Sequence, residues 1–250
     1  MVELLAAIGG VAFILASLVM GLRLLLLARR TREVPELAVG LALFLMGGLA
    51  YPVLAVARFA TPLSEALRIA LALFALLLYG LGTVAIAVFN WRVFRPSEPW
   101  ARTAVLGLAS ALVGSMLLEA LTPGLREAAL HNRGAGLRVF FLLIGVPIAW
   151  ASYESLRFHG LLVKRIKFGL GDPVVADRMW LWGISTFAAF LTNLATSVAA
   201  FFGVDFAVSP FGALLIAPLG LVAAGAMWLA FFPPESYTRR VAARAAASEA

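Results

Sequence analysis

Two groups of polar side chains interrupt an otherwise apolar chain and are the first candidates for chemistry. The larger group lies at the ends or in the middle of apolar blocks and consists of Glu119, Arg58, Tyr51, Tyr79, Asn193, Glu65 and Arg68. Ionisable groups inside an apolar block usually serve a function, so these residues are predicted to line a polar pocket for a small ligand. The alternative is a ring of interfacial ion pairs, in which Glu65 and Arg68 pair at a spacing of three residues.

The second group is expected at the other boundary of the apolar layer and consists of Glu154, Arg157, Asp177 and Arg178. Glu154 and Arg157 are three residues apart, which suits a pair on one helix face. Asp177 and Arg178 are expected to open a helix, where an acid suits the positive helix end. This inner-face polar cluster is either functional or a set of salt bridges that fixes loops.

Motifs for enzyme chemistry do not support a catalytic assignment. The sequence contains no Ser–His–Asp set, glycine-rich phosphate loop, HExxH motif or acidic cluster, so no catalytic residue and no metal site is predicted. His131 and His159 are expected in loops on opposite sides of a membrane, where they cannot jointly hold a haem or a metal. There is no cysteine, which excludes thiol ligands and disulfides.

The composition decides the fold class. The chain is 63% hydrophobic and 13% charged, with a mean hydropathy of +0.99, whereas soluble domains carry about 25% charged residues. Continuous apolar blocks predict an all-α, polytopic transmembrane helix bundle rather than a barrel. Seven spans are expected at residues 4–27, 37–56, 69–89, 104–121, 138–156, 179–204 and 210–232. In an alternative topology, the fourth and fifth blocks form a re-entrant hairpin and only five helices cross.

The basic residues predict the orientation. Most arginines and both lysines fall in one set of loops and in the tail. Positive residues stay on the cytoplasmic side, so the N-terminus is expected outside and the C-terminus inside. The longest loops are expected at 122–138 outside and 157–178 inside. The tail, 235–250, is a juxtamembrane segment that either lies along the inner surface or frays. The net charge of +7 thus points to the lipid bilayer and not to a nucleic acid.

Two segments suggest an internal repeat. Residues 22–52 and 160–190 each pass from a helix through basic residues to a proline, Pro35 or Pro173, that opens the next helix. A genuine repeat would give three helices, a linker helix and three more helices, an arrangement known from transporters. A basic loop followed by any helix start would look the same.

The segment 169–183, GLGDPVVADRMWLWG, resembles a stretch of uncharacterised bacterial seven-helix integral membrane proteins. The general topology is similar to that of receptor-type seven-helix proteins, rhodopsins and the SWEET family. The seventh helix contains no lysine, which excludes a retinal Schiff base. The resemblance implies a multi-pass protein of a bacterial inner membrane and no known activity, and neither haem nor another cofactor is expected.

Three functions remain open at this point. The first is a receptor-like or sensory membrane module that binds a small or lipophilic ligand among its helices and signals to a cytoplasmic protein partner through its basic inner loops. The second is a small-molecule transporter or permease with the 3+1+3 helix arrangement. The third is an accessory subunit of a larger membrane complex, and a membrane-embedded enzyme is the least favoured class.

Overall fold

The computed structural model describes residues 2–60, 62–121, 134–204, 206 and 209–247, and these residues contain no strand. The helices are α1 (Val2–Thr31), α2 (Val34–Ala42), the π-helical segment η1 (Leu43–Ala50), α3 (Tyr51–Phe59), α4 (Glu65–Phe94), α5 (Pro99–Leu121), α7 (Ala135–Ile166), α8 (Pro173–Phe201), α9 (Pro210–Phe231) and α10 (Glu235–Ala247). Because α2, η1 and α3 follow one another without a break, they act as one long helix.

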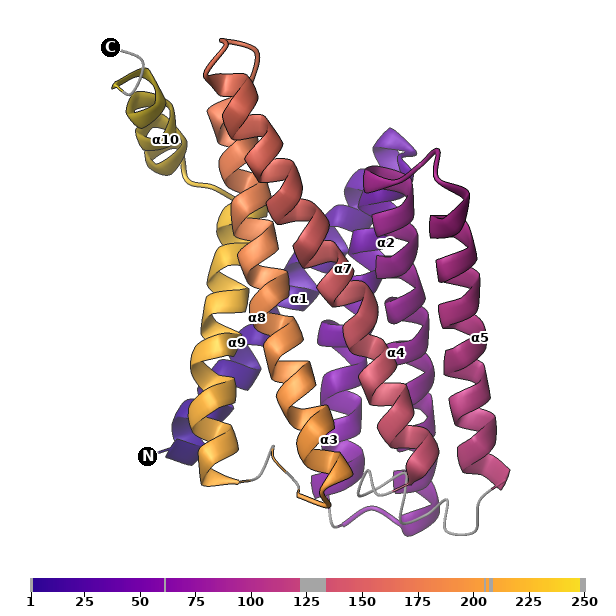
Figure 1. Ribbon diagram of the computed structural model, residues 1–250. Coiled ribbons are helices and arrows are strands. Elements are labelled where there is room, and N and C mark those ends of the chain that lie inside the picture. Colours follow the sequence, from indigo (N-terminus) through magenta and orange to yellow (C-terminus); the bar gives the residue numbers. More distant parts are fainter. Residues whose placement is uncertain (1, 61, 122–133, 205, 207–208, 248–250) are drawn as a thin grey trace.

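Seven helices are long and apolar enough to cross a membrane: α1, α2–η1–α3, α4, α5, α7, α8 and α9. The all-α helical bundle with seven candidate spans is therefore confirmed. The two weakest predicted spans are real helices, since α5 has 23 residues and α7 has 32, and about 20 are needed to cross. Both run along the height of the bundle (Figure 1), which favours seven spans over a re-entrant hairpin.

Most helices extend beyond the apolar blocks that predicted them. The largest difference concerns residues 157–178. The prediction of an inner loop over this range was wrong, because α7 continues to Ile166 and α8 already begins at Pro173. Lys164 and Arg165 lie in the last turn of α7, where positive charge suits the negative helix end. Charge therefore ended the apolar block without ending the helix. His159 accordingly lies within α7 and not in a loop, whereas His131 falls outside the described residues.

Side chains and prolines fix the start of α8 and of α9. Pro173 is the first residue of α8, as predicted, and the Asp172 carboxylate before it accepts a hydrogen bond from the Val174 N–H at 2.8 Å. Pro210 opens α9 in the same way, and the Ser209 hydroxyl oxygen before it accepts from the Gly212 N–H at 2.9 Å. The first backbone N–H groups of a helix have no partner within the helix. The N-cap oxygen accepts a hydrogen bond from one of them, and the proline has no N–H that would need a partner.

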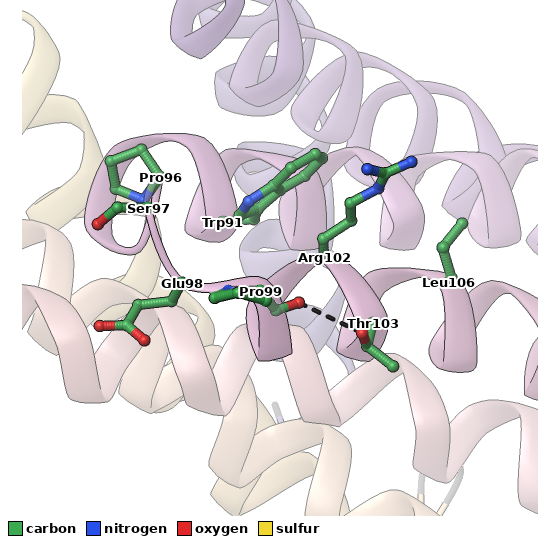
Figure 2. A pocket seen from close by; sticks show the side chains of 8 residues that line it. All are labelled: Trp91, Pro96, Ser97, Glu98, Pro99, Arg102, Thr103 and Leu106. Atoms are coloured by element: carbon green, nitrogen blue, oxygen red, sulfur yellow. Dashed lines mark hydrogen bonds between the residues drawn. The ribbon is translucent and has the colours of Figure 1, made fainter.

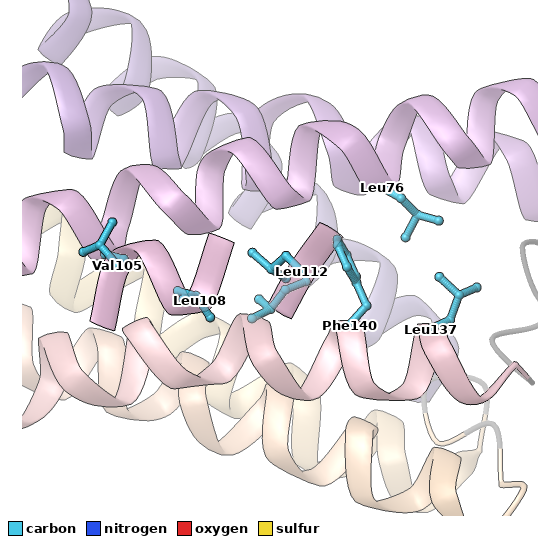
Figure 3. Close-up of a cluster of buried hydrophobic side chains, with 8 residues drawn as sticks. Leu76, Val105, Leu108, Leu112, Leu137 and Phe140 are labelled. Carbon is cyan, nitrogen blue, oxygen red and sulfur yellow. The ribbon is translucent and has the colours of Figure 1, made fainter. Parts of the chain in front are cut away.

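Six of the spans form a closed ring in the order α1, α2–η1–α3, α4, α7, α8 and α9, with α9 packed against α1. The remaining span, α5, lies outside the ring against α4 and α7 (Figure 1). Buried apolar side chains from these three helices join them (Figure 3): Leu76, Val105, Leu108, Leu112, Leu137 and Phe140.

The two ends of the bundle differ in charge. At one end of the bundle, which we call the basic end, α1, α4 and α7 finish and α5 and α8 begin. Helix α10 also lies at this end (Figure 1). Its basic residues include Arg29, Arg30, Arg32, Arg92, Arg95, Arg102, Lys164, Arg165, Lys167 and Arg178. The other end is called the opposite end, and its described arginines are Arg58, Arg68 and Arg138.

Trp182 of α8 fills the ring interior toward the basic end. Its side chain is buried and meets Phe89 of α4 and Phe231 of α9 edge to face, with ring centroids 5.9 and 5.4 Å apart. Met20 of α1 and Met227 of α9 belong to the same cluster. Each aromatic pair of this kind contributes about 0.5–1.5 kcal/mol beyond simple burial. The two pairs thus join α8 to α4 and α9, and the cluster extends to α1.

Candidate functional site

Glu119 is the most buried carboxylate of the opposite end, and its contacts are those of a helix cap. The side chain is 1% exposed, and its Oε2 accepts a hydrogen bond from the Leu137 N–H at 3.1 Å. Gly134 and Gly136 make room for it, because a Cβ on either residue would collide with Glu119. A carboxylate near unpaired N–H groups and the positive helix end stabilises the start of α7.

Replacing Glu119 with alanine should therefore destabilise the fold by about 1–2 kcal/mol, the usual cost of losing a helix cap. Thermal unfolding of the purified protein would show this as a lowered Tm. Glu33→Ala removes an exposed carboxylate before α2 that makes no capping hydrogen bond, and it serves as the matched control. Equal Tm values for the two variants would contradict the capping role of Glu119.

Arg68 also holds a helix end. Its Nε donates to the Ala57 carbonyl oxygen and its Nη2 to the Arg58 carbonyl oxygen, both at 2.8 Å. These carbonyls belong to the last turn of α3, whose negative end favours a cation. Glu65 is the exposed first residue of α4, one residue after the capping Ser64. The geometry thus gives Glu119 and Arg68 defined structural partners, and a ligand-binding role for them stays a prediction.

Tyr79, Tyr51 and Arg58 lie in one neighbourhood, because Tyr79 interacts electrostatically with the other two side chains. Tyr79 packs edge to face against Phe141 of α7 with centroids 6.0 Å apart. Tyr51 is 44% exposed and meets Phe13 of α1 at 6.4 Å. Three of the predicted ligand residues are therefore close enough to interact, with Tyr79 against α7 and Tyr51 against α1.

Asn193 joins this neighbourhood through α7. Its Nδ2 donates to the Phe141 carbonyl oxygen at 3.1 Å, so Phe141 contacts both Asn193 and Tyr79. Its Oδ1 lies against Gly145, where a Cβ would come within 2.5 Å, and is buried without a hydrogen-bond partner. A buried amide oxygen that accepts no hydrogen bond costs free energy. Asn193 is thus half satisfied, as is Asn90 of α4, and a buried atom of this kind calls for an explanation.

Two more polar atoms on α8 and α7 have the same property. Ser197, one helical turn further along α8, is 2% exposed, and its Oγ has no partner. The Nε of Arg138 on α7 is also buried without a partner, and Arg138 shares a helix face with Phe141 and Gly145. We call Tyr79, Phe141, Asn193, Ser197 and Arg138 the opposite-end patch. Its unsatisfied donors and acceptors could hold a ligand with both kinds of polar group.

Glu154 is the centre of the polar cluster at the basic end. Its carboxylate is 3% exposed and lies 2.6 Å from Arg95 Nε and 3.3 Å from Arg157 Nη1. The Trp150 Nε1–H also donates to Oε1 at 3.4 Å. The hydrogen bond to Glu154 raises the pKa of Arg95 above its ordinary value, so the guanidinium stays charged. One carboxylate therefore joins the end of α4 to α7.

The two other predicted members of that cluster lie elsewhere. Asp177 of α8 accepts a hydrogen bond from the Tyr237 hydroxyl of α10 at 2.8 Å. This bond ties the C-terminal helix to α8, so the tail helix is anchored rather than frayed along Glu235–Ala247. Arg178 is exposed. The inner-face cluster thus divides into an Arg95–Glu154–Arg157 network and a separate Asp177–Tyr237 contact.

An open depression of about 510 Å³ lies at the turn between α4 and α5. Its lining comes from the end of α4, the turn and the start of α5 (Figure 2): Trp91, Pro96, Ser97, Glu98, Pro99, Arg102, Thr103 and Leu106. The Thr103 hydroxyl donates back to the Pro99 carbonyl oxygen within its own helix. Because its polar side chains are exposed and diverge, we regard it as a surface feature of the turn.

Sequence reasoning missed several partners of the residues that it selected. Arg95 was read only as a basic loop residue, Trp150 was not considered, and Tyr237 was assigned to a tail. The partners of Arg95 and Tyr237 are about 60 residues away, and no local spacing points to them. Trp150 lies four residues before Glu154 on the same helix face, so its contact could have been predicted. Asn90 was also missed, although it is fully buried and donates to the Pro147 carbonyl oxygen at 2.7 Å. An amide directly after the apolar block 69–89 was the available signal.

The helices and their apolar surfaces define the class: a multi-pass helical membrane protein with seven candidate spans. No protein-family model, no curated protein and no solved structure matches this chain.

Proposed function

We propose that the protein is a receptor-like or sensory module of a bacterial inner membrane, with its basic end in the cytosol. It binds a small or lipophilic ligand at the opposite-end patch and signals to a separate protein through the basic end. The observation that carries this proposal is the set of buried, unsatisfied polar atoms on Asn193, Ser197 and Arg138. The orientation rests on the positive-inside rule.

The aromatic side chains of the patch suit the apolar part of such a ligand. Tyr79 and Phe141 contact each other edge to face, and Tyr51 and Arg58 interact with or lie near Tyr79. Ligand sites are mostly apolar with a few polar groups that fix orientation. A ligand with a hydrogen-bond donor for Asn193 Oδ1 and an acceptor for Arg138 Nε would satisfy both atoms.

Helix α7 connects the patch to the basic end. It carries Arg138 and Phe141 near its start and Glu154 and Arg157 in its second half, without a break at Pro147. Asn90 of α4 braces it by donating to the carbonyl oxygen of Pro147 itself. A helix that is held at both ends and packs along α8 can transmit a shift as a rigid element. This supports signalling through the basic end without a separate output domain in the described residues.

Asn193→Leu should abolish ligand-induced stabilisation. The protein in lipid nanodiscs would be screened by thermal shift against small carboxylates, alcohols, amino acids and fatty acids, and hits raise the Tm through binding to the folded state. We expect hits with the unmodified chain and a loss of at least about tenfold in affinity with Asn193→Leu, because one lost buried hydrogen bond is worth about 1.5 kcal/mol. The substitution loses the single hydrogen bond from Asn193 Nδ2 to the Phe141 carbonyl oxygen, which is worth about 0.5–1.5 kcal/mol, so the protein should stay folded with a slightly lowered Tm.

Thr192→Val is the matched control, because the Thr192 hydroxyl donates only to the Ala188 carbonyl oxygen of its own helix. It should leave the affinity unchanged. The chain has no cysteine, so a single Leu170→Cys can carry an environment-sensitive fluorophore at the basic end. Hits should also change its emission. Hits that bind equally well to both variants, or that leave the fluorophore unaffected, would contradict the proposal.

A small-molecule transporter is the second candidate. The observation that favours it is the ring order of the helices, in which α5 alone lies outside two sets of three spans. A pseudo-twofold pairing of α1, α2–η1–α3 and α4 with α7, α8 and α9 would match the parallel repeats of some transporters. Saturable uptake of a hit compound into liposomes, lost in Asn193→Leu, would favour transport over sensing.

A further inference from the structure

A helical hairpin projects from the basic end. It consists of the last part of α7 and the first turns of α8, residues 155–178, and stands above the ends of α2, α4 and α5 in Figure 1. Arg95 and Glu154 are in contact and so lie at one level. From Glu154 to the end of α7 at Ile166 are twelve residues, or about 18 Å at 1.5 Å per residue. We refer to this segment as the projecting hairpin.

The turn of the projecting hairpin has a fixed backbone. Gly169 has φ +68°, a value that glycine adopts without strain, and its N–H donates to the Ile166 carbonyl oxygen at 2.8 Å. The N–H groups of Phe168 and Leu170 both donate to the Arg165 carbonyl oxygen at 3.0 Å. This is the glycine-terminated helix end that satisfies the last carbonyls of α7. The turn is therefore preorganised.

Contacts along its length hold the projecting hairpin in place. The His159 ring nitrogen Nδ1 of α7 is 2.8 Å from the Ala176 carbonyl oxygen of α8, and Leu162 is buried between the two helices. On the other side, the hydrogen bond from Tyr237 to Asp177 attaches α10. The hairpin is thus a braced arm rather than a loose loop.

The tip presents apolar and basic side chains together. Phe168 and Leu170 are each 78% exposed, which is a high exposure for large apolar side chains. Lys164, Arg165 and Lys167 beside them are exposed, and Lys164 and Lys167 are the two lysines of the whole chain. Both acids of the hairpin are already engaged, Asp172 by the Val174 N–H and Asp177 by Tyr237. The charge left for a partner is therefore positive.

We propose that the tip of the projecting hairpin is a docking site for an acidic amphipathic helix of a partner protein. Phe168 and Leu170 would insert into the apolar face of that helix, and Lys164, Arg165 and Lys167 would meet its carboxylates. A preorganised turn lowers the entropy lost on binding. The inference rests on the proposed function, because it names the partner class through which the basic end would signal.

The reach of the projecting hairpin argues against its own membrane as the occupant. The headgroup layer adds about 5–8 Å to each side of the hydrocarbon core. Even at a tilt of about 40°, an arm of about 18 Å rises roughly 14 Å past the level of Glu154. The predicted span 138–156 puts Glu154 at the boundary of the hydrocarbon core, so we expect Phe168 and Leu170 to lie beyond the headgroups, in the aqueous phase.

The test uses the full chain in nanodiscs of phosphatidylcholine and a fluorescent 18-residue helical peptide with glutamate on one face and leucine on the other. Fluorescence anisotropy measures peptide binding, and empty nanodiscs give the background. Lys164→Glu/Arg165→Glu/Lys167→Glu should weaken binding by about 30-fold or more, and Phe168→Ser/Leu170→Ser by about tenfold. The matched control Arg29→Glu/Arg30→Glu/Arg240→Glu changes the net charge equally at exposed positions of the same end and should change binding less than about threefold.

Three results would overturn the docking site: no binding above empty nanodiscs, equal weakening by both charge-reversal variants, or tighter hairpin-dependent binding to phosphatidylserine vesicles than to the peptide. The last result would assign the tip to an anionic lipid surface. All substituted side chains are exposed, so an unchanged Tm confirms that the variants fold. The hairpin variants should also keep the ligand-induced Tm shift, so failure of docking and failure of ligand binding can be told apart.

Discussion

Gly136→Ala is expected to be among the most destabilising single substitutions in this chain. A Cβ on Gly136 would lie 2.8 Å from the Glu119 backbone nitrogen and would collide with the Ser115 carbonyl oxygen. Both obstacles are backbone atoms of α5, which cannot move aside as a flexible side chain would. Forcing α5 and α7 apart should cost about 3 kcal/mol, or roughly 6–12 °C in Tm. Thermal unfolding in detergent would measure it.

Gly114→Ala is the matched control for this prediction. Gly114 lies on α5, and a Cβ there meets nothing within 4 Å. Because alanine favours a helix over glycine by about 0.5–1 kcal/mol, this change should be neutral or slightly stabilising. If Gly136→Ala left the Tm as unchanged as Gly114→Ala, the close contact of α5 with the start of α7 would be wrong.

Glu154→Ala should give the second large effect, because it leaves two arginines without their shared carboxylate. Arg95 and Arg157 have side-chain exposures of 22% and 46%, which lets water screen part of the loss. The cost should therefore fall below that of a fully buried pair, with a Tm lowered by roughly 4–8 °C. Glu154→Gln keeps the shape without the charge and should give an intermediate Tm. Glu33→Ala, at an exposed carboxylate between α1 and α2, should have little effect.

A double-mutant cycle separates the network from simple loss of a side chain. If Arg95 and Glu154 stabilise each other, Arg95→Ala combined with Glu154→Ala should cost clearly less than the sum of the single changes. Strict additivity would show that the Arg95–Glu154 contact contributes nothing measurable. The same cycle with Arg157, which is more exposed, should give a smaller coupling.

The helical spans could be predicted from the sequence because they depend on composition within one segment. Apolar blocks such as 69–89 must be helical in lipid to satisfy their backbone groups, and α4 contains that whole block. The limits of the helices were harder to predict. Lys164 and Arg165 end the hydropathy signal of α7 but favour its C-terminal turn, so the helix continues where the apolar block stops.

The candidate site was only partly predictable, because its contacts join distant parts of the chain. Tyr79, Tyr51, Arg58 and Asn193 were selected for their polarity, and the structure places the first three together and links Asn193 to them through Phe141. The role of Glu119 depends on room left by two glycines that follow it in sequence by 15 and 17 residues. Such steric complementarity has no signature in the local pattern of either segment.

The π-helical turns of η1 have a consequence for the side chains that follow them. A π-helix has about one more residue in each turn than an α-helix, because its hydrogen bonds join residues five apart instead of four. If all residues of Leu43–Ala50 were kept but wound as a regular α-helix, the extra residue would turn α3 by about 100° about its axis. Tyr51 and Arg58 would then swing from α1 and Tyr79 toward other neighbours. The direction in which Tyr51 and Arg58 point thus depends on the preceding segment Leu43–Ala50, which contains no polar side chain.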